Sequence, residues 1–116
     1  MEPQEFEKGK AMIIVEIIEY VPDSVVIKTI LKKSTGRVNA VSIDTGETLE
    51  EKSSPFDNFI QIVDGKAEVI IDGASKLLET GQSIIIPAHA RRSFKANDRF
   101  KMISTVIKSG YKEVAL

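Results

Sequence analysis

The feature that most constrains the fold is a series of short β-branched runs, separated roughly every ten residues by glycine, proline or aspartate. Runs of four to eight residues of this kind, bounded by turn residues, are typical of β-strands. Many short strands at such a spacing predict a sandwich or a barrel. We therefore expect an all-β chain. The predicted strands are Val25–Leu31, Arg37–Ile43, Phe59–Val63, Ala67–Ile71, Lys76–Leu78, Ser83–Ile86 and Phe100–Ile107.

Turn residues separate these runs. Gly46 closes the second run, where glycine can adopt a positive φ without steric cost. Asp64-Gly65 and Asp72-Gly73 each predict a β-hairpin, because this dipeptide suits the two central positions of a tight hairpin turn. Pro87 is expected to end the strand before it, since proline cannot donate to a sheet ladder.

One segment, Met12 to Tyr20, is compatible with either a strand or a short helical turn, because periodicity cannot decide over so short an apolar run. We favour a short helical turn near Val15 to Glu19, ended by Pro22. Residues 1–10 are expected to be loosely ordered. Residues 11–116 are expected to form a single domain, as the length of 116 residues suggests.

Composition excludes several classes of function. The net charge of −1 gives no bulk electrostatic reason to bind nucleic acid or an anionic membrane. The chain has no cysteine, which excludes disulfides, thiolate catalysis and cysteine-ligated zinc and fits a reducing compartment. The acidic N-terminus does not resemble a signal peptide, and no apolar stretch is long enough to span a bilayer. We expect a cytoplasmic protein with neither nucleic-acid nor membrane partners.

The stretch from Gly46 to Ala96 resembles the small single-domain cupins. Two family motifs, G-x5-H-x-H-x(3,4)-E-x6-G and G-x5-P-x-G-x2-H-x3-N, match it in their glycine and proline framework. Gly46 and Gly65 frame the first motif, and Gly81 and Pro87 frame the second with matching spacing. The resemblance implies a double-stranded β-helix, the cupin or jelly-roll barrel, for residues 11–116.

The positions at which this family binds metal depart from the motifs. The two histidines of the first motif fall at Lys52 and Ser54 and its glutamate at Asn58, and the histidine of the second motif falls at Arg92. Protonated lysine and arginine repel a divalent cation, and serine and asparagine are weak ligands for transition metals. The chain has a single histidine, so no other register restores the site. We expect no transition-metal site and no cofactor.

Strand alternation suggests which side chains face the barrel interior. Asn58 would face inward together with Ile60 and Ile62, and Arg92 together with Phe94. One interpretation is a site for a small anionic molecule, with the guanidinium binding in fork geometry. Its candidate residues are Lys52, Ser54, Asn58, Arg92 and Phe94. The alternative is that Lys52 and Arg92 extend to solvent and pair with Glu50, Glu51 or Asp57.

Other polar features are weaker. His89, the only histidine, occupies the position of the second motif's second glycine. It could act as a general acid or base, but a solvated turn residue is the favoured interpretation. Arg91 and Arg92 are adjacent in a strand and would point to opposite faces, so they do not form one basic patch for nucleic acid.

Three hypotheses on function remain open. The first is a metal-free, non-catalytic module that binds or senses a small molecule. The second is a metal-independent isomerase or epimerase, whose base could be His89, Tyr20, Tyr111 or a carboxylate. The third is a structural domain with a packed barrel. A homodimer is also expected, with a contribution from the apolar segment Ile13–Ile18, because small cupins commonly pair through sheet edges and exposed edges must be covered.

Overall fold

The structure is a computed structural model that describes residues 5–110. A single turn of 3-10 helix, η1 (Ile14–Glu16), precedes eight strands, which confirms the all-β prediction. The strands are β1 (Val25–Lys33), β2 (Gly36–Ile43), β3 (Thr48–Glu51), β4 (Asn58–Ile71), β5 (Ala74–Glu79), β6 (Ser83–Ile86), β7 (Arg92–Lys95) and β8 (Phe100–Ile107). The helical turn overlaps the predicted one near Val15 to Glu19.

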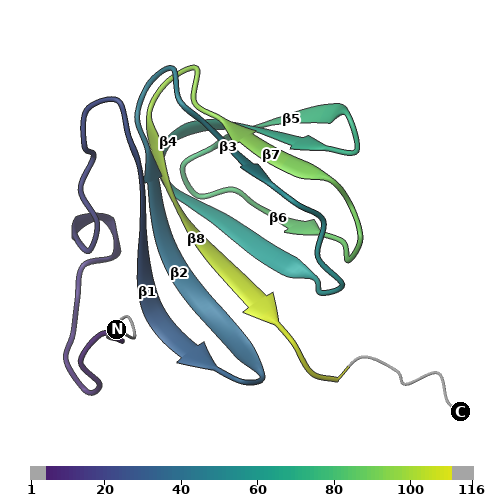
Figure 1. The fold of residues 1–116 in the computed structure, drawn as a ribbon. Helices are drawn as coiled ribbons and strands as arrows, with labels where there is room; N and C mark the ends of the chain where they lie inside the picture. Colours follow the sequence, from purple (N-terminus) through teal and green to yellow (C-terminus); the bar gives the residue numbers. More distant parts are fainter. Residues whose placement is uncertain (1–4, 111–116) are drawn as a thin grey trace, which may run out of the picture.

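The strands form one curled sheet in the order β1-β2-β8-β4-β7-β3, with β5 and β6 also paired to β4 (Figure 1). All the neighbouring pairs are antiparallel. The first half of β4 lies between β6 and β8, and its second half lies between β5 and β7. β4 therefore belongs to both walls of the barrel.

The hairpin predicted at Asp64-Gly65 is wrong, because these two residues lie inside the 14-residue strand β4. The pairing of β4 with β8 shifts register between Ile62 and Asp64, which marks a bulge, and Gly65 has φ +87°. An aspartate–glycine pair suits a bulge with a left-handed glycine as well as a hairpin turn. Here β4 bends at the bulge and passes from one wall to the other.

The hairpin predicted at Asp72-Gly73 is confirmed. It joins β4 to β5, and both residues have positive φ, 48° and 83°. Two successive positive φ values characterise the two-residue turn whose twist matches that of the paired strands. Pro87 follows directly after β6, as predicted.

The interior is filled by apolar residues from both walls. The buried cluster contains Val41, Ile43, Ile60, Ile62, Ala67, Val69, Leu78, Ile86, Ala90, Phe94, Ala96, Phe100 and Met102. Along β4 the buried residues alternate with exposed ones from Asn58 to Ile62, and from Arg92 to Ala96 they alternate with half-buried or exposed ones. The predicted inward-facing positions are therefore confirmed.

A second, smaller cluster lies on the outer face of the sheet, where Ile18 packs with Ala40 and Ile103. The N-terminal segment runs beside β1 (Figure 1). It is attached by Tyr20, whose hydroxyl donates to Asp64 Oδ2 at 2.6 Å, and by Lys101 Nζ, which donates to the Val15 carbonyl at 2.6 Å.

Nearer the start of the segment, the Phe6 N–H donates to the Ile30 carbonyl at 3.0 Å. The predicted looseness of residues 1–10 stays a prediction, since residues 1–4 lie outside the described part of the chain.

We expect Gly65→Ala to lower the free energy of unfolding by about 3 kcal/mol or more, as backbone overlap and left-handed strain add together. A Cβ at position 65 would overlap the carbonyl oxygen of Arg99 and lie 2.9 Å from the Phe100 Cα. Urea unfolding followed by circular dichroism measures the change.

Gly81→Ala is the matched control, because Gly81 also has positive φ but a Cβ there meets nothing within 4 Å. The control isolates backbone strain, at about 1–2 kcal/mol. Equal losses in the two variants would show that the close approach at Gly65 contributes nothing.

Candidate functional site

Side chains inside the barrel change from apolar to polar along the strands. Inward-facing residues that lie opposite one another on β2, β8 and β4 form four layers, from one end of the barrel to the other. They run Ile43–Phe100–Gly65, then Val41–Met102–Ile62, then Asn39–Ser104–Ile60, then Arg37–Val106–Asn58. The polar groups of the interior thus gather at one end, which we call the mouth.

A pocket of about 260 Å³ opens at the mouth. It is lined by Arg37, Asn39, Glu51, Lys52, Ser54, Phe56, Asn58, Arg92, Ser104, Val106 and Lys108. Four of the five candidate residues from the sequence are among them. The fifth, Phe94, is fully buried in the apolar core and does not line the pocket.

Arg92 is the most deeply placed cation of this mouth pocket, and only 5% of it is exposed to solvent. Its Nη2 donates to the carbonyls of Ala90 and Pro87 at 3.3 and 3.5 Å, and its Nε donates to Ala90 at 3.4 Å. These distances are at the long end of the range for hydrogen bonds. The alternative in which Arg92 extends to solvent is therefore wrong.

The other candidate residues differ in their burial. Lys52 is exposed at the rim, after the end of β3. Ser54 is half-buried, and its Oγ accepts from the Phe56 N–H at 3.2 Å. Asn58 is buried, and its Oδ1 accepts from the Ser104 hydroxyl at 3.0 Å. Lys52 alone keeps the solvent exposure that the alternative interpretation expected for both cations.

Sequence analysis missed several pocket residues, chiefly Arg37, Asn39, Ser104 and Lys108. The candidates came from the motif positions and from alternation along the strands of Asn58 and Arg92, and these four residues lie outside both sets. Alternation along β2 could have found two of them, since Arg37 and Asn39 share a face with the buried Val41.

Glu51 is the carboxylate among the pocket residues. In the register of β3 and β7, its backbone lies opposite that of Arg92. Loss of hydration raises the pKa of its carboxyl group, and the charges of Arg92 and Arg37 act in the opposite direction. Although the residue as a whole is exposed, its carboxyl lies close enough to the protein to lose part of its hydration.

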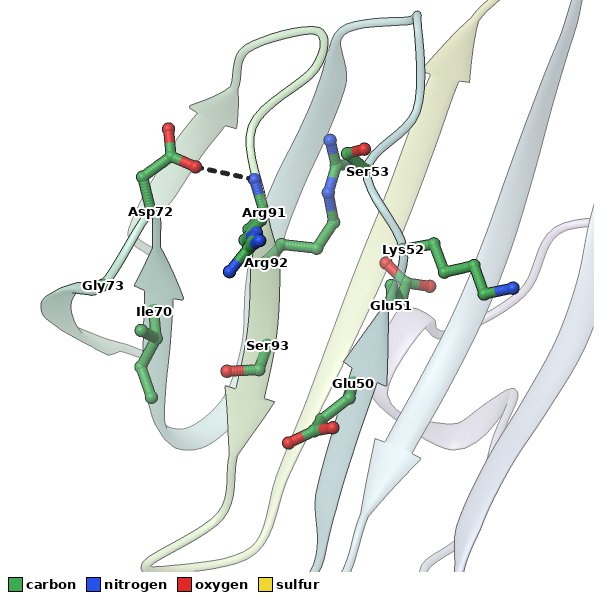
Figure 2. A pocket seen from close by; sticks show the side chains of 10 residues that line it. All are labelled: Glu50, Glu51, Lys52, Ser53, Ile70, Asp72, Gly73, Arg91, Arg92 and Ser93. Atoms are coloured by element: carbon green, nitrogen blue, oxygen red, sulfur yellow. Dashed lines mark hydrogen bonds between the residues drawn. The ribbon is translucent and has the colours of Figure 1, made fainter.

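A second, shallower hollow of about 570 Å³ adjoins the mouth pocket and shares Glu51, Lys52 and Arg92 with it. Figure 2 shows that the side chains of Arg91 and Arg92 leave the chain in different directions, with Arg92 running toward Ser53. Arg91 is exposed, and its N–H donates to Asp72 Oδ1 at 2.8 Å. Both arginines nevertheless line this hollow, so the prediction that they form no common basic patch is not confirmed.

Two candidate bases lie away from the mouth pocket. His89 is exposed with φ 71°, and its N–H donates to the Ser54 carbonyl at 2.6 Å, which is the geometry of a turn residue. Tyr20 lies on the outer face, where burial and the hydrogen bond to Asp64 raise its pKa. Tyr111, also considered, lies outside the described residues.

The chain belongs to the cupin family. The family model described as "Cupin domain" matches residues 39–106, which is more than half of the chain. This agrees with the fold, and with the framework glycines and proline from which the resemblance was first drawn. The comparison with curated proteins gives no match.

Solved structures support the same fold. A conserved protein of unknown function from Streptococcus pyogenes, SPY1581, is 25% identical with a TM-score of 0.86, over 96% of this chain and 98% of that one. A cupin superfamily protein from Desulfitobacterium hafniense (DSY2733) is 18% identical with a TM-score of 0.83, over 94% and 100%. KdgF from Halomonas sp. is 18% identical with a TM-score of 0.67, over 79% and 86%.

The metal that the cupin motifs imply does not fit the residues of this mouth. Among residues 5–110, no three histidine, cysteine, aspartate or glutamate side chains cluster in a way that could hold a metal ion. The pocket instead carries arginine and lysine side chains, which repel a divalent cation.

We expect Arg37→Gln to raise the pKa of Glu51 further, because the substitution removes one of the two charges that favour the ionised carboxylate. A carbon-detected NMR titration of the Glu51 carboxyl measures the change. Arg91→Gln is the control, since Arg91 is not among the charges that act on Glu51. A Glu51 pKa that shifts equally in both variants, or falls in Arg37→Gln, contradicts this electrostatic account.

Proposed function

We propose that this cupin is a metal-independent, non-catalytic module that binds a small anionic molecule in the mouth pocket. The observation that carries the proposal is the buried guanidinium of Arg92, held in a pocket that also contains Arg37, Lys52 and Lys108. Glu51 supplies one carboxylate against these four cations. A carboxylate or phosphate group balances such an excess of charge.

The hydrogen bonds of Arg92 support a role in binding. A guanidinium carries five N–H donors in a planar fork, and the bonds to Ala90 and Pro87 use only Nε and Nη2. No acceptor among residues 5–110 is bonded to Nη1, so a ligand can engage that edge of the fork. The apolar layers beneath the mouth close the pocket from below, as is usual for small-molecule sites.

The enzymatic alternative, a metal-independent isomerase or epimerase, would rely on Glu51. This carboxyl lines the pocket and has a raised pKa, which is a property of proton-transfer groups. The binding module is preferred because proton transfer of this kind commonly needs a second group on the opposite face of the substrate. His89 and Tyr20, the other described candidates, do not line the pocket.

The third alternative, a packed barrel with a purely structural role, fits one end of the molecule better than the other. Apolar side chains fill the interior in the layers of Ile43 and Ile62, but the mouth is open and polar. A scaffold without a ligand would gain stability from apolar residues there. Within the described residues, no helix is both long and apolar enough to cross a membrane. From the composition alone, we also propose a cytoplasmic location and no nucleic-acid partner.

We further propose a homodimer in which the start of the apolar N-terminal segment contributes to the contact. Ile17 and Ile18 pack in the outer cluster of the sheet. Met12, Ile13 and Ile14, in contrast, remain 45%, 60% and 43% exposed. Light scattering at micromolar concentration is expected to give twice the mass of the chain. Ile13→Glu is expected to shift the mass toward the monomer, while Leu77→Glu, at an exposed site on β5, leaves it unchanged. A monomeric mass for the unmodified chain contradicts the dimer.

We expect Arg92→Ala to weaken the binding of sulfate and succinate about tenfold or more, since a charge-assisted hydrogen bond contributes about 1.5–3 kcal/mol. Calorimetric titration at low salt gives the dissociation constants, and erythritol serves as the neutral probe. Arg91→Ala is the matched control, because it removes the same charge from the adjacent, exposed position.

Two results would count against the anion pocket. The first is a failure of both anions to bind the unmodified chain at millimolar concentration. The second is an equal loss of affinity in Arg91→Ala, which would indicate general attraction to surface charge.

A further inference from the structure

The wall that β2 contributes to the mouth pocket contains two polar atoms with no partner. Arg37 Nε and Asn39 Oδ1 are buried, and among residues 5–110 neither is hydrogen-bonded. Both residues line the pocket. Buried polar atoms are nearly always paired with protein, water or ligand, so such atoms in a pocket wall call for an explanation.

The two atoms are of opposite kinds. Arg37 Nε carries a proton and donates, whereas Asn39 Oδ1 accepts. The residues are two apart on one strand, so their side chains leave the same face of β2 at positions about 7 Å apart. A molecule that satisfies both atoms needs an acceptor and, a few bonds away, a donor.

Neighbouring groups do not meet this need. Ser104, the cross-strand partner of Asn39, donates its hydroxyl to Asn58 Oδ1 at 3.0 Å. Arg92 is bonded to the loop carbonyls of Ala90 and Pro87. Asn39 Oδ1 therefore stays unpaired within the described residues, in a side chain that lines the pocket.

We propose that the ligand is a small hydroxy acid, whose carboxylate is bound by Arg37 and Arg92 and whose hydroxyl donates to Asn39 Oδ1. This inference rests on the anion-binding function proposed above and adds the class of anion. Asn39 is thereby the residue that selects a hydroxy acid over a plain carboxylic acid.

The charge of the mouth explains why the donor is a hydroxyl. An ammonium group could also donate to Asn39, as in an amino acid. The pocket, however, already holds Arg37, Lys52, Arg92 and Lys108 against the single carboxylate of Glu51. A further positive charge is repelled there, whereas a neutral hydroxyl is not. The volume of about 260 Å³ suits a molecule of only a few carbons.

Calorimetric titration of the full chain with malate, succinate and aspartate tests the inference. Malate and succinate have the same carboxylates and differ by one hydroxyl, and both enantiomers of malate are used. We expect the better enantiomer to bind about tenfold more tightly than succinate, because a hydrogen bond to an otherwise unpaired buried acceptor is worth roughly that factor. Aspartate is expected to bind more weakly than malate.

The variants assign the selectivity to one side chain. Asn39→Ala is expected to bring malate down to the affinity of succinate while leaving succinate unchanged. Asn97→Ala is the matched control: it removes a side chain of the same kind outside the mouth pocket, where its amide donates to Glu68, and the preference for malate should survive. If Asn39→Ala does not fold, the comparison of malate with succinate in the unmodified chain still decides.

Each outcome has a distinct meaning. Equal binding of malate and succinate by the unmodified chain overturns the hydroxy-acid inference and leaves the anion pocket standing. A preference for malate that persists in Asn39→Ala overturns the role of Asn39. Aspartate binding more tightly than malate overturns the choice of a hydroxyl. Binding of none of the three removes the anion pocket as well.

Discussion

The close approach of β4 to the start of β8 at Gly65 is the contact on which the rest of the sheet depends. β4 pairs directly with β5, β6, β7 and β8, and the remaining strands are attached through β7 or β8. The strand can serve both walls only because it bends at the bulge. The bend brings its backbone against Arg99 and Phe100, where a side chain has no room. One glycine thus fixes the relation between the two walls, and with it the position of Arg92 on β7 relative to Arg37 on β2.

Much of the fold could be predicted from the sequence because its signals are local. Alternation identified the inward-facing residues of β4 and β7, and the turn at Asp72-Gly73 has the conformation that its residues favour. The same kind of signal was misleading at Asp64-Gly65. Whether an aspartate–glycine pair reverses a chain or bends a strand depends on the strands that pair with it, and those are distant in the sequence.

Sequence analysis predicted only part of the candidate site, and the reason is related. Positions matched to the motifs led to Lys52, Ser54, Asn58 and Arg92, all of which line the mouth pocket. They did not lead to β2, which enters the site because it pairs with β8, the strand next to β4 in the curled sheet. Phe94 shows the opposite error: it faces inward as expected, but it lies at the depth of the apolar core. Alternation predicts the face of a strand, and only the register between strands sets the depth.

The charge of the mouth is a cost to the fold that a ligand can offset. Like charges held together repel one another, and the repulsion lowers the free energy of unfolding. Glu51 compensates incompletely. Because burial raises its pKa, its ionised form is less favourable in the folded chain than in the unfolded one. Its ionisation therefore lowers the free energy of unfolding as the pH rises from the unfolded pKa through the raised folded pKa. The carboxylate that lies opposite Arg92 in the sheet register is thus itself poorly solvated. An anion that brings its own negative charge stabilises the folded chain through the same groups that destabilise it when alone, so affinity and stability are linked at this mouth.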